Sequence, residues 1–177
     1  MPTTENESCP DCGFVWDNVL LVEVPKRLEV GTGSFVALLA RDDAIVSVRP
    51  SNERWSIAEY AGHVRDVLLT VRERMIAATI VDRPTGLPIF REERVALGYY
   101  DLDTAAELAS ELRVASGLLV KTVRSIPEGL DSRTMNYGFP SPTERPVTWV
   151  AAQGVHELEH HLGDARENVR LRTSMLA

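Results

Sequence analysis

The sequence has few cysteines, no long hydrophobic run and a deficit of basic residues, and each shortage excludes a class of protein. Cys9 and Cys12 are the only cysteines among 177 residues, too few for the disulfide framework of a small secreted domain. No apolar stretch approaches the roughly 20 residues that a transmembrane helix requires. Residues 1–8 lack the basic start and apolar run of a secretory signal, so we expect a cytoplasmic protein with no membrane partner.

Basic residues are outnumbered by acidic ones, 19 to 26, and the formal net charge is −7. Nucleic-acid affinity comes largely from Lys and Arg side chains that neutralise phosphates, so we expect no nucleic-acid partner. The composition, with 44% hydrophobic and 25% charged residues, is typical of a globular protein. A chain of 177 residues is long enough for one domain with a sizeable core.

The two cysteines lie in a Cys-Pro-Asp-Cys-Gly motif within residues 1–24, which we assign to an N-terminal arm ahead of the main domain, residues 25–177. Cys-x-x-Cys in a cytosolic protein is typical of half a zinc site or of a redox pair. A structural zinc ion takes four ligands, and the sequence contains no second Cys-x-x-Cys. The motif is therefore completed by another chain, completed by non-cysteine groups, or a reactive dithiol. An arm without an essential role is the remaining alternative.

Apolar residues recur at spacings of three and four in four segments, which predicts four amphipathic helices. Two of these segments begin with Ser or Thr followed three residues later by Glu, the capping-box pattern of a helix start. The predicted helices cover residues 25–40, 56–78, 104–125 and 148–171. Because hardly any alternating strand pattern is present, the sequence predicts an all-α four-helix bundle.

Two long connections separate the last three predicted helices. Residues 81–103 contain a short amphipathic piece, and residues 130–146 contain three prolines and one glycine. Long connections in compact domains are often functional, so we expect the first to form a lid or pocket wall, with Tyr99 and Tyr100 as candidates. A short hairpin within these loops is compatible with the sequence.

All four histidines fall within the second and fourth predicted helices. His156 and His160 are four residues apart, which places both imidazoles on one face of a helix. His63 lies beside the apolar stripe of the second helix, so we expect it to face inward. We predict that His63, His156 and His160 bind one divalent metal, zinc or another first-row ion such as nickel, because calcium and magnesium need clustered oxygen ligands. Three protein ligands leave a coordination position open, as in catalytic metal sites.

Residues 156–160 also read His-Glu-Leu-Glu-His, the His-Glu-x-x-His signature of zinc proteases in which the glutamate is the general base. Arg166 stands where the extended form of this signature has a third histidine. The preceding sequence also lacks the strands that wall a protease cleft. A protease with Glu157 as its base is therefore the weakest alternative.

The segment Arg54-Trp55-Ser56-Ile57-Ala58-Glu59 with His63, paired with residues 156–164, resembles the DinB-like superfamily of metal-binding four-helix bundles. The resemblance extends over residues 25–172 in organisation, and its motifs lie in the second and fourth helices. It implies the ligands His63, His156 and His160, with His161 as a second choice, and it suggests a homodimer. Two features depart from the family pattern: the Cys-x-x-Cys arm, and a histidine at position 156 where some members have a carboxylate.

The superfamily includes mycothiol- and bacillithiol-dependent enzymes. The resemblance therefore implies transfer or isomerisation with a low-molecular-weight thiol such as mycothiol, acting on an electrophilic substrate, with the metal favouring the thiolate. A hydrolase would use the same three ligands, and the sequence assigns no catalytic residue. Glu59, Glu157 and Glu159 are candidates to accept hydrogen bonds from imidazole N–H groups. The rival from another class is a non-enzymatic protein that senses metal or thiol and docks a partner through the arm.

Overall fold

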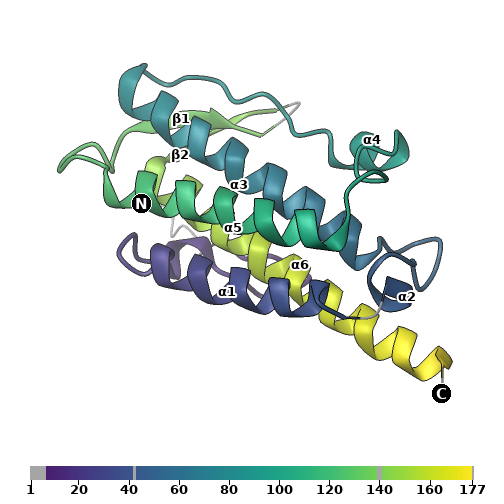
Figure 1. Cartoon of the computed structure of the whole chain (residues 1–177). Coiled ribbons are helices and arrows are strands. Elements are labelled where there is room, and N and C mark those ends of the chain that lie inside the picture. Colours follow the sequence, from purple (N-terminus) through teal and green to yellow (C-terminus); the bar gives the residue numbers. More distant parts are fainter. Residues whose placement is uncertain (1–6, 42, 139–140, 177) are drawn as a thin grey trace.

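Four long helices form the bundle that the sequence predicts. The computed structural model describes residues 7–41, 43–138 and 141–176 (Figure 1). The long helices are α1 (Val24–Leu39), α3 (Ile57–Ile80), α5 (Ala105–Arg124) and α6 (Val147–Leu176). The shorter elements are η1 (Trp16–Asn18), α2 (Asp43–Val46), α4 (Arg91–Ala96), β1 (Thr134–Tyr137) and β2 (Thr143–Pro146). The predicted all-α class is confirmed, with one small hairpin added.

The helix starts follow the capping signals in the sequence. The Ser56 hydroxyl accepts a hydrogen bond from the Glu59 N–H, and the Glu59 carboxylate accepts one from the Ser56 N–H. Thr104 and Glu107 form the same reciprocal pair at the start of α5. These contacts satisfy N–H groups that have no partner within the helix. Helix α6 runs several residues further than expected, and its last turns project beyond the other helices (Figure 1).

Helices α3 and α1 each pack against both α5 and α6, so α1 and α3 occupy opposite corners of the bundle. The chain therefore crosses a diagonal between α1 and α3 and again between α5 and α6. Gly31 on α1 allows a close approach, because a Cβ there would lie 2.8 Å from Cδ2 of Leu158 on α6. The glycine that weakens α1 as an isolated helix thus permits its packing against α6.

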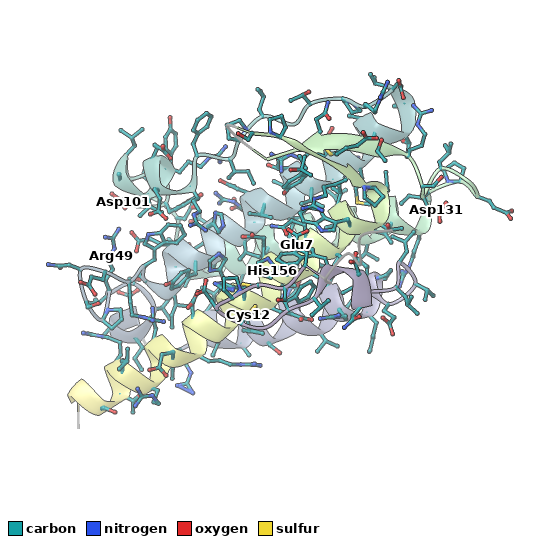
Figure 2. The ribbon with its side chains drawn as sticks, turned by 180° about the vertical axis from the view of Figure 1, so that it is seen from behind. Glu7, Cys12, Arg49, Asp101, Asp131 and His156 are labelled. Carbon is teal, nitrogen blue, oxygen red and sulfur yellow. The ribbon has the colours of Figure 1, made fainter. Side chains whose placement is uncertain are left out.

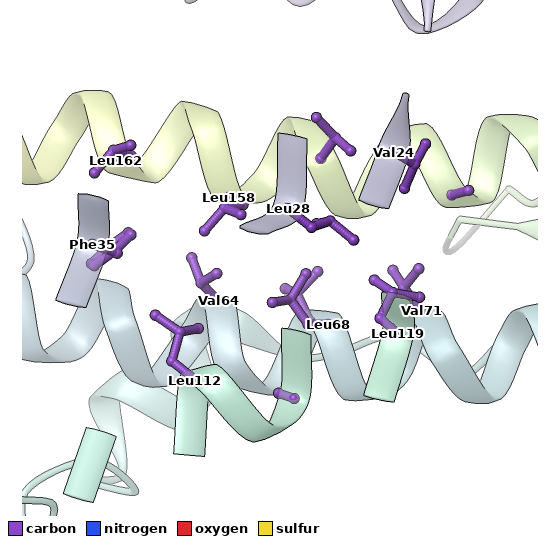
Figure 3. Packing of buried hydrophobic residues seen from close by; sticks show 14 of the residues in the cluster. Val24, Leu28, Phe35, Val64, Leu68, Val71, Leu112, Leu119, Leu158 and Leu162 are labelled. Carbon is purple, nitrogen blue, oxygen red and sulfur yellow. The ribbon is translucent and has the colours of Figure 1, made fainter. Parts of the chain in front are cut away.

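The core lies between the four helices, and Figure 3 shows side chains from all of them pointing into the same interior. Its members are apolar and almost fully buried, which supplies most of the favourable free energy of folding. Representative core residues are Leu28, Phe35, Val64, Leu68, Leu112, Leu119, Leu158 and Leu162.

The two long connections cover one side of α3. Strands β1 and β2 pair antiparallel with Thr134 opposite Pro146, and Thr85 bridges to Asn136 from the earlier connection. Tyr100 is buried against α3, where a Cβ on Gly62 would lie 2.6 Å from its ring, whereas Tyr99 is exposed. Of the two candidate wall residues, only Tyr100 packs against the bundle.

The described part of the N-terminal arm, from residue 7 on, lies along α6. Ser8 pairs with Val15 across a tight loop, and η1 follows directly. The buried Trp16 ring stacks on Trp149 of α6 with ring centroids 5.6 Å apart. Within the described part of the chain, no helix combines the length and the apolar character needed to cross a bilayer.

Candidate metal centre

The four potential ligands on α6 divide between two faces of that helix. Successive helical residues are about 100° apart, so residues 156 and 160 share one face and residues 157 and 161 share another. Leu158 and Leu162 point into the core. Residues 157 and 161 flank this apolar stripe on the side of α3, and residues 156 and 160 point away from the core toward the N-terminal arm.

The pair beside α3 meets His63 in a buried cluster. The Oε2 atom of Glu157 lies 3.2 Å from Nε2 of His63 and 3.4 Å from Nε2 of His161. The three potential ligand atoms all lie within 4.8 Å of one another. The His63 side chain is only 2% exposed, which confirms that it faces inward as expected. We call His63, Glu157 and His161 the inner cluster.

Hydrogen bonds orient the inner cluster from behind. Nδ1 of His161 lies 3.0 Å from Oδ2 of Asp164, so a hydrogen bond donated there leaves Nε2, which faces Glu157, as the nitrogen available to a metal ion. The other carboxylate oxygen of Glu157 accepts a hydrogen bond of 2.7 Å from Gln153. Gln153 in turn accepts one of 2.6 Å from the indole N–H of Trp16. A residue of the arm is thus linked to the cluster through one intermediate.

The environment favours the ligand forms of Glu157 and His63, but not that of His161. At His161 burial lowers the pKa, but the carboxylates of Asp164 and Glu157 outweigh it and raise this pKa, so a metal ion has to displace a proton there. Burial alone would raise the pKa of Glu157, but the imidazoles of His156, His161 and His63 outweigh it and hold this pKa well below its usual range. Burial lowers the pKa of His63 despite the opposing effect of Glu157. An ionised carboxylate and a neutral imidazole are the forms that act as metal ligands.

Two imidazoles and one carboxylate fit a divalent first-row ion. The same donor set occurs in catalytic zinc sites, where a fourth position stays open, and in non-haem iron(II) sites. Nδ1 of His63 is buried and has no hydrogen-bond partner among the described residues, so the ring is not committed to another protein group at that nitrogen. The inner cluster is therefore suited to hold one ion.

A pocket of about 510 Å³ opens beside the inner cluster, within the range of small-molecule sites. The connections before α4 and at the hairpin form part of its wall, as expected of a long connection, but the candidates Tyr99 and Tyr100 are not among the residues that line it. Arg74 lies in this pocket with its guanidinium 4.5 Å from the centroid of the Tyr137 ring. Residues lining the pocket include His63, Val67, Arg74, Tyr137, Gln153 and Glu157.

His156 and His160 lie in a different cluster, with Cys9 and Cys12 of the arm. The structure therefore does not bring His63, His156 and His160 together at one site. The prediction grouped His156 and His160 with the inward-facing His63, whereas Leu158 and Leu162 occupy the core-facing side of α6 and the two histidines lie outside it. The apolar spacing around these leucines is the signal that sets the rotation of α6 and so points to residues 157 and 161.

The geometry of the zinc-protease signature His-Glu-x-x-His is also not formed. Glu157 contacts His63, His161 and Gln153, and Nδ1 of His156 lies 3.6 Å from its carboxylate, too far for a hydrogen bond. The glutamate does not stand free beside an ion held by His156 and His160. Of the other candidate acceptors, Glu59 pairs with Arg49 and Glu159 with Arg27, so neither touches an imidazole.

The profile of the DinB superfamily matches residues 28–165. This chain belongs to the DinB superfamily. No curated protein matches the sequence of this DinB protein.

Two solved folds resemble this DinB protein. YfiT from Bacillus subtilis, described as a probable metal-dependent hydrolase with an unusual four-helix bundle topology, aligns with a TM-score of 0.78 at 13% identity and covers 93% of each chain. A mycothiol-dependent maleylpyruvate isomerase aligns with a TM-score of 0.68 at 17% identity. That alignment covers 85% of this chain and 62% of the isomerase, so this chain spans less than two thirds of the isomerase length. At these identities the likeness establishes the fold.

Proposed function

We propose that this DinB protein is a metal-dependent enzyme. It catalyses a transfer or isomerisation reaction that uses a low-molecular-weight thiol such as mycothiol. His63, Glu157 and His161 would hold one divalent ion, with zinc the best match to the donors. The observation that carries the proposal is the convergence of two imidazoles and one carboxylate at the edge of a small-molecule pocket. Membership of a superfamily that includes such enzymes supports the choice of thiol.

A divalent ion held by His63, Glu157 and His161 would supply Lewis acidity, which favours the nucleophilic thiolate form of a thiol at the site. The protein groups around it keep the ligands in place. Asp164 sets the tautomer of His161, and Gln153 fixes the carboxylate of Glu157. Apolar wall residues such as Val67 and Ile89 reduce the water in the pocket, which strengthens electrostatic interactions with a bound substrate.

Two guanidinium groups line the pocket beside the carboxylate of Glu93 and offer a place for a negatively charged group of the substrate. The Arg74 guanidinium donates from Nη2 to the backbone oxygen of Leu87, while its buried Nε has no hydrogen-bond partner in the described ranges. Arg91 also lines the pocket. A carboxylate on the electrophile or on the thiol would pair with these cations, because planar guanidinium groups bind carboxylates well.

A hydrolase is the second candidate, and the alignment with YfiT over 93% of both chains favours it. A hydrolase would use the same three ligands and the same pocket, with water as the nucleophile in place of the thiol. The two candidates differ in whether turnover requires a thiol. A non-enzymatic sensor would bind metal and ligand without turnover.

The test compares Glu157→Gln with Glu159→Gln, because both glutamates lie on α6 and only Glu157 belongs to the inner cluster. Metal-loaded protein is assayed with mycothiol or bacillithiol and an electrophile such as maleylpyruvate, with and without the thiol. We expect thiol-dependent turnover that falls by about 100-fold or more in Glu157→Gln, since even residues that only orient metal ligands contribute about 10–100-fold. Glu159→Gln should retain its activity within about twofold, because its half-buried ion pair with Arg27 lies outside the inner cluster.

Each other outcome has a definite meaning. Thiol-independent turnover that is lost in Glu157→Gln would support the hydrolase. Tight metal and thiol binding without turnover of any electrophile would support the sensor. If Glu157→Gln keeps its metal and its full activity, the inner cluster is not the active site and the proposal is overturned.

A further inference from the structure

The arm brings two sulfur atoms to the outward pair of histidines on α6. Sγ of Cys9 lies 3.8 Å from Nδ1 of His160. Potential ligand atoms of Cys9, Cys12, His156 and His160 all lie within 4.8 Å of one another. Figure 2 shows Cys12 and His156 close together over α6. We call these four residues the outer cluster.

The backbone of the arm holds the two thiols on the same side of a tight turn. The Cys9 N–H donates to the Phe14 oxygen at 2.8 Å, and the Gly13 N–H donates to the Cys9 oxygen at 2.9 Å. Gly13 has a φ of +72°, in the left-handed region that glycine adopts without strain. Burial would raise the pKa of the Cys9 thiol, but the backbone N–H groups of Cys12 and Asp11 outweigh it and lower this pKa, whereas burial raises the pKa of the Cys12 thiol.

His156 supplies an independent sign that a ligand is missing. It is 8% exposed, and neither of its ring nitrogens has a hydrogen-bond partner among the residues that the structure covers. The rings of Phe14 and Trp16 shield it from solvent, with centroids 5.1 Å and 4.7 Å away. Buried polar groups in native proteins are nearly always partnered, and here the Glu157 carboxylate stays 3.6 Å from Nδ1 while ligand atoms of Cys9 and Cys12 lie within 4.8 Å.

We propose that Cys9, Cys12, His156 and His160 bind one Zn²⁺ ion, at a site separate from the inner cluster. Two thiolates and two neutral imidazoles match the tetrahedral donor set of structural zinc. Binding forms two Zn–S and two Zn–N bonds, releases the two thiol protons to solvent and changes no oxidation state. Because four protein ligands fill the coordination sphere, this ion is structural and takes no substrate.

The outer site fixes the arm on α6, and the arm reaches the inner cluster. Trp16 follows the cysteine turn by a few residues and donates to Gln153, which donates to Glu157. Asp164 lies between the clusters, 3.0 Å from Nδ1 of His161 and 3.6 Å from Nε2 of His160. The zinc ion therefore acts as a positioning element for the inner cluster, while its binding does not depend on the reaction proposed above.

The first test counts metal ions and identifies their ligands. Full-length protein is loaded with zinc under reducing conditions, freed of excess metal and analysed. We expect two zinc ions per chain in the wild type and in the control Asp11→Asn, which keeps both thiols, and one in the Cys9→Ser/Cys12→Ser variant. In His161→Gln, X-ray absorption should show one ion with two sulfur ligands at about 2.3 Å and two nitrogen ligands at about 2.0–2.1 Å.

The second test needs no substitution and guards against a variant that fails to fold. Titration of the wild type with an organomercurial, which takes up thiolates, should release one of the two zinc ions and leave the other bound. The proposal is overturned if the wild type holds one ion without sulfur ligands. It is equally overturned if neither the serine variant nor the mercurial changes the zinc content, or if a Cys9–Cys12 disulfide persists in the reducing buffer.

Discussion

The inner and outer clusters take their α6 ligands from the same two turns, and the two pairs of positions are offset by one residue. The clusters nevertheless have different chemical character. The inner cluster takes one histidine from α3, is ringed by hydrogen bonds and borders a pocket. The outer cluster takes both of its remaining ligands from the arm and is covered by aromatic rings. The helix supplies two ligands in each case. The segment that packs against each face determines whether the coordination sphere stays open or is closed.

The strongest test of this distinction removes an inner ligand. In His161→Gln we expect kcat/KM with the thiol and electrophile to fall by more than about 100-fold, because even residues behind metal ligands contribute about 10–100-fold. The sulfur-bound zinc ion should stay in place. Equal loss of both ions would contradict the separation of the two clusters.

Removing the outer ligands should chiefly reduce stability. In Cys9→Ser/Cys12→Ser no zinc ion links the arm to α6. We expect the free energy of unfolding to fall by about 3 kcal/mol, within the range seen when a covalent or metal link is removed. A protein of this size loses about 2–4 °C in Tm per kcal/mol, so the zinc-loaded variant should melt about 6–12 °C below the wild type. Calorimetry with and without a zinc chelator is the measurement. Because the chelator also removes the inner ion, the wild type and the variant should melt at similar temperatures in its presence. Equal Tm values of the two zinc-loaded proteins would contradict the role of the outer site.

A third experiment weakens the contact shared by both clusters. Asp164→Asn removes the carboxylate that fixes the tautomer of His161. We expect the affinity of the inner site for zinc to fall by about 10–100-fold, as for other residues that orient a histidine ligand. Competition with a chromophoric chelator measures this change. The outer site should change less, since Asp164 lies further from His160 than from His161.

The smallest expected effect tests the path from the arm to the inner cluster. Trp16→Phe keeps an aromatic ring against Trp149 and deletes the indole N–H that donates to Gln153. One hydrogen bond contributes about 1 kcal/mol, so we expect about a fivefold decrease in kcat. Both zinc ions should remain bound. A decrease that appears only in KM would instead place Trp16 in substrate binding.

Local signals in the sequence predicted the helices well. The capping boxes at Ser56 and Thr104 mark the starts of α3 and α5, and the short piece at Arg91–Ala96 appears as α4. The hairpin was only compatible with the sequence, because its two strands are four residues each and carry no clear alternation. Short-range rules of hydrogen bonding and apolar spacing are sufficient to explain these elements.

The metal ligands were harder to predict. His63 was predicted to be a metal ligand because it faces inward. Its predicted partners His156 and His160 lie beside the arm instead. The spacing of four residues occurs twice in succession on α6, and the spacing itself does not say which pair faces α3. Leu158 and Leu162 carry that information through their burial, and it becomes clear only when α6 is packed against the other helices.

The sequence by itself determined the four helices, their caps, the scarcity of histidine and the presence of a Cys-x-x-Cys turn, because all of these depend on residues close together in the chain. The tertiary structure alone decided which histidine meets which partner. That choice depends on the rotation of α6 about its axis and on where the arm docks, and both follow from packing between segments more than 90 residues apart in the chain.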